Sequence, residues 1–563
     1  VVTVKYGKLL TAAFEQPGGE ALRDWINECP NELYSALCFK GGASWREHLE
    51  RDFKKGSATR KMVDACDDEA LHRLMTNLAG HDLESLIEAF DAAAAADDDR
   101  PRCFICYTIK GHGLPFAGHK DNHSGLMNPQ QVDGFRETLG IAEGEEWEPF
   151  SGLEEQCGDL QDFLKDVPFA QEYPRRRTAD AVPVPDSLTF KRDARVSTQQ
   201  AFGNILNEIG RSDAQIAEHI VTTSPDVAVS TNLGPWINRR GLFDRREHTD
   251  TFKSEKVISA QSWDISQTGQ HIELGIAENN LFLMLSAMGL SHSLFGKRLL
   301  PIGTLYDPFI SRGLDAMNYA CYQDSRFMLV ATPSGVTLAP EGGAHQSIYT
   351  PLIGMGQPGL TSFEPAFADE LAEIMRWGFE HMQADEGGSV YLRLSTRPID
   401  QVARELDDTL RADILSGGYW LREPSADADI AIIAIGTMAP EALAAHETLV
   451  EDIPGAGLLV ATSADRLMAD WHHARRHRRA GMPAEPSHVE RLLSRLPSHA
   501  GLVTVLDGHP ATLSWMGGVR RHRIQSLGVE DFGRSADIPD IHAVHGIDAD
   551  SILDAAARLC LTG

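Results

Sequence analysis

The sequence has few cysteines, few basic side chains relative to acidic ones, and no long apolar run. Its 8 cysteines are scattered over 563 residues, too sparse for a disulfide scaffold, so the composition favours a reducing compartment. No run of about eighteen apolar residues occurs, so no membrane-spanning helix is predicted. Only 52 Lys and Arg face 81 Asp and Glu, a net charge of −29. This balance disfavours nucleic acid or an anionic membrane as the main partner.

One CxxC pair, Cys103 and Cys106, lies in the apolar run CFICYTI. A strand would direct these two side chains to opposite faces, so we interpret them as structural thiols rather than as a redox pair. The overall composition, 42% hydrophobic and 24% charged residues, is that of an ordinary soluble globular chain.

Apolar strands alternate with helical stretches along most of the chain, which predicts an α/β fold. We expect a first domain over residues 1–165 and a linker rich in proline and charge over residues 166–190. A second domain is expected over residues 191–400 and a third over residues 401–563. A chain of this length has room for several hydrophobic cores.

The segment Gly269–Asn280, GQHIELGIAENN, ends with Glu278 just before the apolar run Leu281–Leu290. That run has the composition of a buried helix. A carboxylate leading into such a helix lies where water is scarce, and it could share a proton with a ligand nitrogen. The position equally suits a glutamate that interacts with the helix dipole and the first backbone N–H groups.

A predicted strand, Arg326–Thr332, leads into the loop Pro333–Ser347, PSGVTLAPEGGAHQS. Two glycines before Ala344 let the backbone approach a ligand closely and bring His345 into a cleft. An imidazole there can act as a general acid and base. The alternative is a loop histidine bonded to the backbone. Glu341 could orient His345 or hold the loop.

Another loop follows the predicted strand Cys103–Ile109. It contains three histidines, of which His123 lies in the sequence NHSG. Loops that follow parallel strands are where α/β proteins place their ligands. Lys110, at the strand end, could approach a phosphate or be a solvated charge.

Three of these stretches, GIAENN, TLYDPF at Thr304–Phe309 and PSGVTLAPEGGAHQS, together resemble the pyrimidine-binding domain of thiamine diphosphate enzymes. The resemblance is to the homodimeric pyruvate dehydrogenase E1 component, with transketolase a more distant relative. It extends over the whole chain, from TIKGHG near the first histidine loop to GVEDFGRSADIPDI near the end. It implies three-layer α/β/α domains with mainly parallel sheets. These would be the C-terminal part of a diphosphate-binding domain, a pyrimidine-binding domain and a transketolase C-terminal-like domain.

The resemblance also implies roles for individual residues. Glu278 would hydrogen-bond the aminopyrimidine ring and drive it to the imino tautomer. His345 and His123 would manage protons on the substrate and on the lipoyl sulfur. Further candidates are Tyr306 and Phe309 over the pyrimidine face, with core packing as an equal alternative, Lys110 at the cofactor, and Arg397, Glu341 and Asn232 at the substrate.

Arg397 bears on the choice between the two families. E1 components of this type do not keep an arginine here, whereas transketolases use a nearby one for sugar phosphate. Its planar guanidinium could bind a carboxylate or a phosphate. Against a transketolase, the histidine that contacts the sugar in that family is replaced here by Thr332 or Pro333. Asn232 could face the active-site loop or belong to an ordinary turn.

The sequence lacks the Gly-Asp-Gly motif with which the family binds diphosphate and magnesium. In the family this motif precedes the region where this chain starts. We therefore expect a piece of a longer protein, whose missing part holds the Mg²⁺ ligands and any targeting segment. The chain alone is expected to bind cofactor poorly and to be inactive.

The predicted function is thiamine diphosphate-dependent oxidative decarboxylation of a 2-oxo acid, pyruvate first, with acyl transfer to the lipoyl group of an E2 acyltransferase. We expect a cytoplasmic homodimer. The alternatives are a transketolase that moves a two-carbon ketol between sugar phosphates, and a non-catalytic scaffold subunit. One basic run, WHHARRHRRAG at Trp471–Gly481, is interpreted as a solvated helix or a docking surface for an acidic partner domain.

Overall fold

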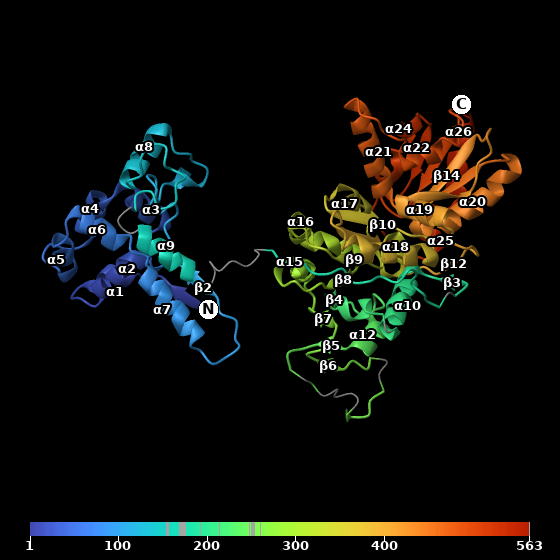
Figure 1. Cartoon of the computed structure of the whole chain (residues 1–563). Coiled ribbons are helices and arrows are strands. Elements are labelled where there is room, and N and C mark those ends of the chain that lie inside the picture. Colours follow the sequence, from blue (N-terminus) through green and yellow to red (C-terminus); the bar gives the residue numbers. More distant parts are fainter. Residues whose placement is uncertain are drawn as a thin grey trace. The chain divides into compact units, whose positions relative to one another are not determined.

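The computed structural model describes residues 1–153, 157–167, 176–191, 193–212, 214–246, 248, 254–258 and 261–561. The chain divides into two units, Val1–Tyr173 and Pro174–Gly563, and each is described by itself (Figure 1). Residues 168–175 of the predicted linker lie outside the described residues. In the described part of the chain, no helix combines the length and apolar character needed to cross a bilayer. All eight cysteines are free thiols.

Unit 1 is built mainly from helices around one core. They are α1 Lys8–Phe14, α2 Gly19–Glu28, α3 Asn31–Lys40, α4 Gly42–Asp52, α5 Ala58–Asp64, α6 Asp68–Met75, η1 Ala79–His81, α7 Leu83–Ala94, η2 Lys120–His123, α8 Pro129–Thr138 and α9 Cys157–Asp166. Its described strands, β1 Val2–Val4 and β2 Phe104–Cys106, form one parallel pair. The strand expected over Cys103–Ile109 is thus only three residues long. Fully buried helix residues such as Leu10, Trp45 and Leu49 supply the core instead.

Unit 2 contains a sheet of eight strands in the order β10-β11-β9-β8-β4-β7-β5-β6, and all its pairs are parallel. The strands are β4 Ile220–Ser224, β5 Leu242–Phe243, β6 Ile265–Ser266, β7 His271–Glu273, β8 Leu300–Leu305, β9 Met328–Ala331, β10 Leu360–Phe363 and β11 Ser389–Arg393. The predicted strand Arg326–Thr332 is confirmed as β9. A short antiparallel pair, β3 Arg195–Val196 with β12 Ile399–Asp400, lies outside this sheet.

The helices of unit 2 are α10 Thr198–Arg211, α11 Ile216–His219, α12 Gly234–Arg240, α14 Glu278–Gly289, α15 Ser291–Leu294, η4 Asp307–Gly313, α16 Leu314–Tyr322, η5 Val336–Glu341, η6 Gly343–His345, α17 Thr350–Gly356, α18 Ala368–His381, α19 Asp408–Ser416, η7 Gly436–Met438, α20 Ala439–Asp452, α21 Ala464–Arg479, α22 His488–Leu493, α23 Ala511–Ser514, α24 Gly517–Arg520, α25 Ile538–His545 and α26 Ala549–Leu561.

Helices cover both faces of the eight-stranded sheet. Alternate side chains of a strand point to opposite faces, so an apolar strand presents apolar side chains to the helices on each side. In β9, Met328 and Val330 pack into a core shared with α10, α12 and α18. Leu329 and Ala331, one residue on, pack into a second core with α14 and α16. Both cores are fully buried at these positions. This arrangement is the predicted three-layer α/β/α domain.

A second sheet of five strands repeats this design, in the order β13-β15-β14-β16-β17. It consists of β13 Gly418–Arg422, β14 Ile430–Ile435, β15 Gly457–Ala461, β16 Gly501–Val505 and β17 Ile524–Leu527, with only β13 antiparallel. Alternate residues of β14 enter two cores: Ile430 and Ile432 face one, and Ala431 and Ile433 face the other. The run ADIAIIAIG therefore forms the central strand of this sheet, and both of its faces are buried.

A buried guanidinium joins the two sheets of unit 2. Arg393, at the end of β11, donates to Asp307 Oδ2 at 2.9 Å, to Glu364 Oε1 at 2.7 Å and to the backbone oxygen of Asp507 at 2.7 Å. Tyr391 adds a hydrogen bond to Asp307 Oδ1 at 2.5 Å. The side chains of Arg393 and Asp307 are 2% and 0% exposed. Burial raises the pKa of Glu364 to about 7, against the pull of Arg393.

Replacing Arg393 by methionine should lower the free energy of unfolding by roughly 3–5 kcal/mol, because it leaves two buried carboxylates without their cation. The loss should be smaller at pH 5.5 than at pH 8, since Glu364, whose pKa burial raises to about 7, can then take up a proton. Urea titrations of the full chain at both pH values measure it. Arg495→Met, which removes a cation paired with Glu423 on the surface, should cost less than about 1 kcal/mol. Equal effects of the two substitutions would contradict the role of Arg393.

Candidate active site

Glu278 is the first residue of α14, and its side chain is buried. It is 7% exposed, and Leu281, Phe282 and Leu285 of the same helix are fully buried. The predicted helix is therefore confirmed, with the acid at its start, but only one of its faces is buried, since Leu283 is 54% exposed. The carboxylate accepts a hydrogen bond from Arg312, a residue that the sequence did not single out.

Arg312 belongs to η4, the turn that follows β8, and it brings aromatic side chains to the acid. Its guanidinium carbon lies 3.9 Å from the ring centroid of Phe309. The rings of Phe309 and Tyr306 are parallel, with centroids 5.9 Å apart. The His345 ring meets both edge-on, at 5.8 Å from Tyr306 and 5.6 Å from Phe309. We call Glu278, Arg312, Phe309, Tyr306 and His345 the Glu278 cluster.

The topology of the sheet explains why these residues meet. Tyr306 comes directly after β8, and the loop that carries His345 comes directly after β9, its parallel neighbour. Glu278 follows β7, which lies on the other side of β4 in the same sheet. The carboxyl ends of parallel strands share one edge, which is where α/β proteins bind ligands.

The loop of His345 is held in place by the second sheet. Asp507, just beyond β16, accepts the backbone N–H groups of Val336 and Thr337 at 2.8 and 2.9 Å. At Gly343 a Cβ atom would lie 2.3 Å from the backbone oxygen of Gly533. The close backbone approach predicted for this glycine pair is thus an approach to the chain's own C-terminal segment.

His345 itself has one buried nitrogen to spare. Its backbone N–H donates to the oxygen of Gly342 at 3.1 Å, and its Nδ1 atom is buried without a hydrogen-bond partner. Buried polar atoms are nearly always paired, so an orphan of this kind marks a place for a ligand group. Glu341 lies at the exposed end of η5.

Two predicted substrate residues have partners within the fold. Arg397 makes a forked ion pair with Glu441, both N–O distances being 2.7 Å. Burial alone would raise the pKa of Glu441, but hydrogen bonds from His542 and Arg397 lower it to about 2. Asn232 has a left-handed backbone, φ 64°, and its amide donates to the backbone oxygens of two α10 residues. Their substrate roles stay predictions.

Lys110 and His123 lie in unit 1 and are in contact. The Nζ atom of Lys110 is 2.7 Å from Nδ1 of His123, and both side chains are exposed. The neighbour of the lysine is therefore an imidazole rather than a carboxylate. The structure describes this pair within unit 1 only.

The Glu278 cluster fits the ring portion of the cofactor predicted from sequence. It offers a buried carboxylate, an aromatic wall and an imidazole whose Nδ1 lacks a partner, groups that suit a planar nitrogen heterocycle. Among the described residues, no group of three or more His, Cys, Asp or Glu side chains could hold a metal ion. We therefore assign no residue to magnesium.

The stretch that carries this geometry is similar to known proteins. Residues 186–397, a stretch that includes the whole Glu278 cluster, match the family model described as pyruvate dehydrogenase E1 component middle domain. The chain is also similar to pyruvate dehydrogenase E1 components. Those of Cupriavidus necator and Mycolicibacterium smegmatis are 27% and 25% identical to it over 80% and 99% of this chain. The chain spans 52% and 62% of the lengths of these two E1 components.

Solved transketolases share the fold. The transketolase from Leishmania mexicana superposes with a TM-score of 0.61 at 16% identity, covering 86% of this chain and 65% of that protein. The enzyme from Campylobacter jejuni gives 0.60 at 16% identity, with coverages of 94% and 75%. At such identity the likeness shows the fold alone, and the predicted transketolase-like fold is confirmed.

The pairing of Arg397 with Glu441 can be measured with Arg397→Met, Glu441→Gln and the double variant. Each single change should lower the free energy of unfolding at pH 7 by roughly 1–3 kcal/mol, because it leaves one partly buried charge without its partner. The double variant should lose less than the sum, with a coupling of about 1 kcal/mol or more. Urea titration checks this. Strict additivity would mean that the guanidinium is available to a substrate without breaking a stabilising pair.

Proposed function

We propose that the chain forms the catalytic part of a thiamine diphosphate-dependent E1 component. Such an enzyme decarboxylates a 2-oxo acid, pyruvate first, and passes the acyl group reductively to the lipoyl group of an E2 acyltransferase. The observation that carries the proposal is the buried carboxylate of Glu278, which lies within the stretch that matches the E1 middle domain. A cytoplasmic homodimer and the Mg²⁺ requirement belong to the same proposal.

Bound thiamine diphosphate would supply an electron sink for the decarboxylation. Glu278 would hold a proton between its carboxylate and a ring nitrogen of the aminopyrimidine, a task for which a water-poor site is suited. Phe309 and Tyr306 would cover the ring and exclude water. His345 would hold or deliver a proton on the substrate side through its unpartnered Nδ1. His123 would do the same toward the lipoyl sulfur.

Arg312 has a specific place in this proposal. Its guanidinium donates a hydrogen bond to the Glu278 carboxylate, but the arginine side chain is 51% exposed. An ion pair with one solvated member is worth little and can exchange partners easily. Arg312 would therefore satisfy the buried acid until the ring nitrogen replaces it, and would then turn to solvent while still lying against Phe309.

The transketolase alternative depended on Arg397 as a phosphate ligand. That guanidinium is engaged by Glu441, so using it for a sugar phosphate would require the pair to break. The shared fold with transketolases does not distinguish the two activities. The oxo-acid reaction is therefore the better-supported proposal, and the sugar reaction is the natural comparison in an assay.

Glu278→Gln in the complete protein, which includes the N-terminal part expected from the sequence, should lower kcat for pyruvate oxidation by ~100-fold or more, because the amide cannot carry the proton. Activity is measured with ferricyanide as electron acceptor in the presence of thiamine diphosphate and Mg²⁺. Glu218→Gln removes an exposed carboxylate from α11 and should leave kcat unchanged. Wild-type activity in the Glu278 variant would refute its role.

The same preparation separates the alternatives. If the complete wild-type protein turns over xylulose and ribose phosphates but not pyruvate, the transketolase alternative holds. If the complete protein turns over neither and calorimetry detects no thiamine diphosphate binding, the scaffold alternative holds.

A further inference from the structure

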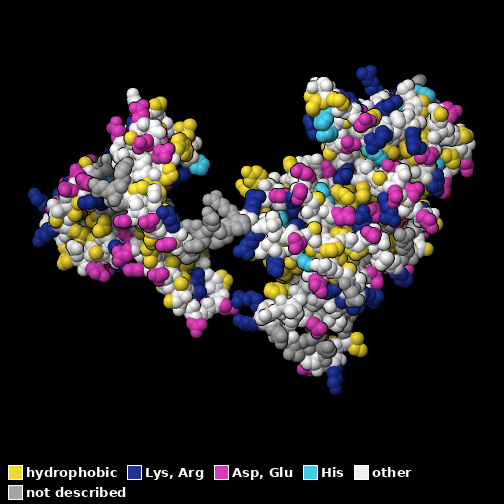
Figure 2. Space-filling model, viewed as in Figure 1, with side chains coloured by type: hydrophobic (Ala, Val, Ile, Leu, Met, Phe, Trp, Pro, Cys, Tyr) yellow, Lys and Arg dark blue, Asp and Glu magenta, His cyan; other side chains and the backbone are white. Residues whose placement is uncertain are grey.

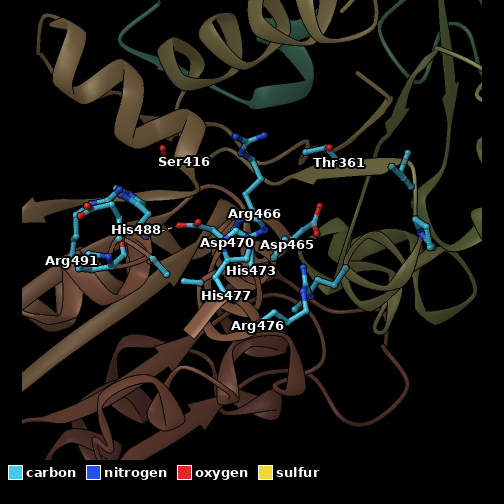
Figure 3. Close-up of a pocket in the computed structure, with 18 of the residues that line it drawn as sticks. Thr361, Ser416, Asp465, Arg466, Asp470, His473, Arg476, His477, His488 and Arg491 are labelled. Atoms are coloured by element: carbon cyan, nitrogen blue, oxygen red, sulfur yellow. Dashed lines mark hydrogen bonds between the residues drawn. The ribbon is translucent and has the colours of Figure 1, made fainter. Parts of the chain in front are cut away.

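Unit 2 contains an open cleft that shares no residue with the Glu278 cluster. It has a volume of about 1070 Å³, which is the size of a small-molecule site. Its walls are α21 and α22 with the segment 483–486 between them, and its far side is the turn 355–361 with Ser416 (Figure 3). The basic run Trp471–Gly481 forms much of α21. A ligand bound in the cleft would therefore contact side chains of that run.

Arginine and histidine side chains line much of the cleft wall: Arg466, Arg476 and Arg491 with His473 and His477. A further histidine, His488, is buried with its Nε2 atom 2.7 Å from the backbone oxygen of Gly418, and burial lowers its pKa. Within the described residues, none of the three guanidiniums forms an ion pair with a carboxylate. Arg491 donates to the backbone oxygen of Pro486 at 2.5 Å. On the surface of unit 2 that carries α21, Figure 2 shows Lys and Arg in dark blue beside His in cyan.

The two carboxylates deeper in the cleft are already used to brace its walls. Asp465 accepts the backbone N–H of Ser362 at 3.0 Å, and Asp470 accepts that of His488 at 2.6 Å. Burial raises the pKa of Asp465 to about 6, so this carboxylate is still mostly ionised at neutral pH. A third acid, Glu485, is exposed at the rim. The charges of Asp465 and Asp470 act on the Arg466 guanidinium at the inner end of the cleft.

Two features hold some of these donors in place. The guanidinium of Arg466 lies 4.9 Å from the Trp377 ring centroid and 5.9 Å from that of Phe363, and its Nε is buried without a partner. His473 and His477, one turn apart on α21, have ring centroids 4.1 Å apart. Figure 3 shows Arg466 and Arg476 on opposite sides of this histidine pair. Such an array suits an anion with several acceptor oxygens.

We propose that the cleft between α21 and α22 binds a small phosphate-bearing molecule, with Arg476, His473 and His477 on its phosphoryl oxygens and Arg466 at the inner end. A planar guanidinium matches phosphate geometry, and the hydroxyls of Thr361 and Ser416 line the same cleft. The net charge of −29 disfavours a nucleic acid chain as the occupant. This binding site shares no residue with the Glu278 cluster. The proposal therefore does not depend on the proposed E1 activity.

The test is isothermal titration of the full chain with inorganic pyrophosphate, without divalent metal and at about 0.15 M salt. The wild type should show saturable binding. The double variant His473→Ala/Arg476→Ala should bind ~10-fold or more weakly, because it removes a fork and an imidazole donor. Both side chains are exposed, so the fold should persist, which circular dichroism checks.

Arg479→Ala is the matched control, since it removes the same charge from the same helix outside the cleft. It should leave the affinity within about twofold of the wild type, because solvent and salt screen that charge. Absence of saturable binding by the wild type overturns the proposal. So does an equal weakening in Arg479→Ala, which would show that the basic run acts only as a diffuse charge.

Discussion

The buried hydrogen bonds and ion pairs of Arg393 connect loops of the two sheets in unit 2. This one guanidinium binds Asp307 from η4, Glu364 from the segment after β10 and the backbone of Asp507 from the second sheet. Each of these segments follows the end of a strand. A buried charge is tolerated only when its partners satisfy it fully. The geometry of the cluster that contains Glu278 therefore depends on an interaction that involves none of its members.

The periodicity of the sequence predicted the layers well. Strands such as β9 and β14 are unbroken apolar runs because both of their faces are covered, and helix α14 reads as apolar because it packs under the sheet. In unit 1 the same kind of pattern predicted more strand than the structure contains. There the apolar run after Cys103 pairs with β1 over only three residues, and helices supply the core. A local pattern does not reveal whether a partner strand is present.

The site was predicted less completely than the fold. Burial of Glu278 followed from its neighbours, and His345 from the glycines before it. The partners did not follow, because they are distant in sequence: Arg312 is 34 residues from Glu278, Glu441 is 44 from Arg397, and Asp507 is 171 from Val336. Only the fold brings such pairs together. The one local signal for Arg312 was its spacing of three residues from Phe309 in a turn rich in proline and glycine.

The contact between Gly343 and Gly533 has an evolutionary consequence. Because neither backbone leaves room for a side chain at Gly343, the imidazole loop and the C-terminal segment must change together over generations. Exchanging the last third of the chain with that of a distant relative would bring a foreign backbone against the loop. Recombination is therefore expected to succeed only when both segments come from the same parent, even though one of them contributes no side chain to the cluster.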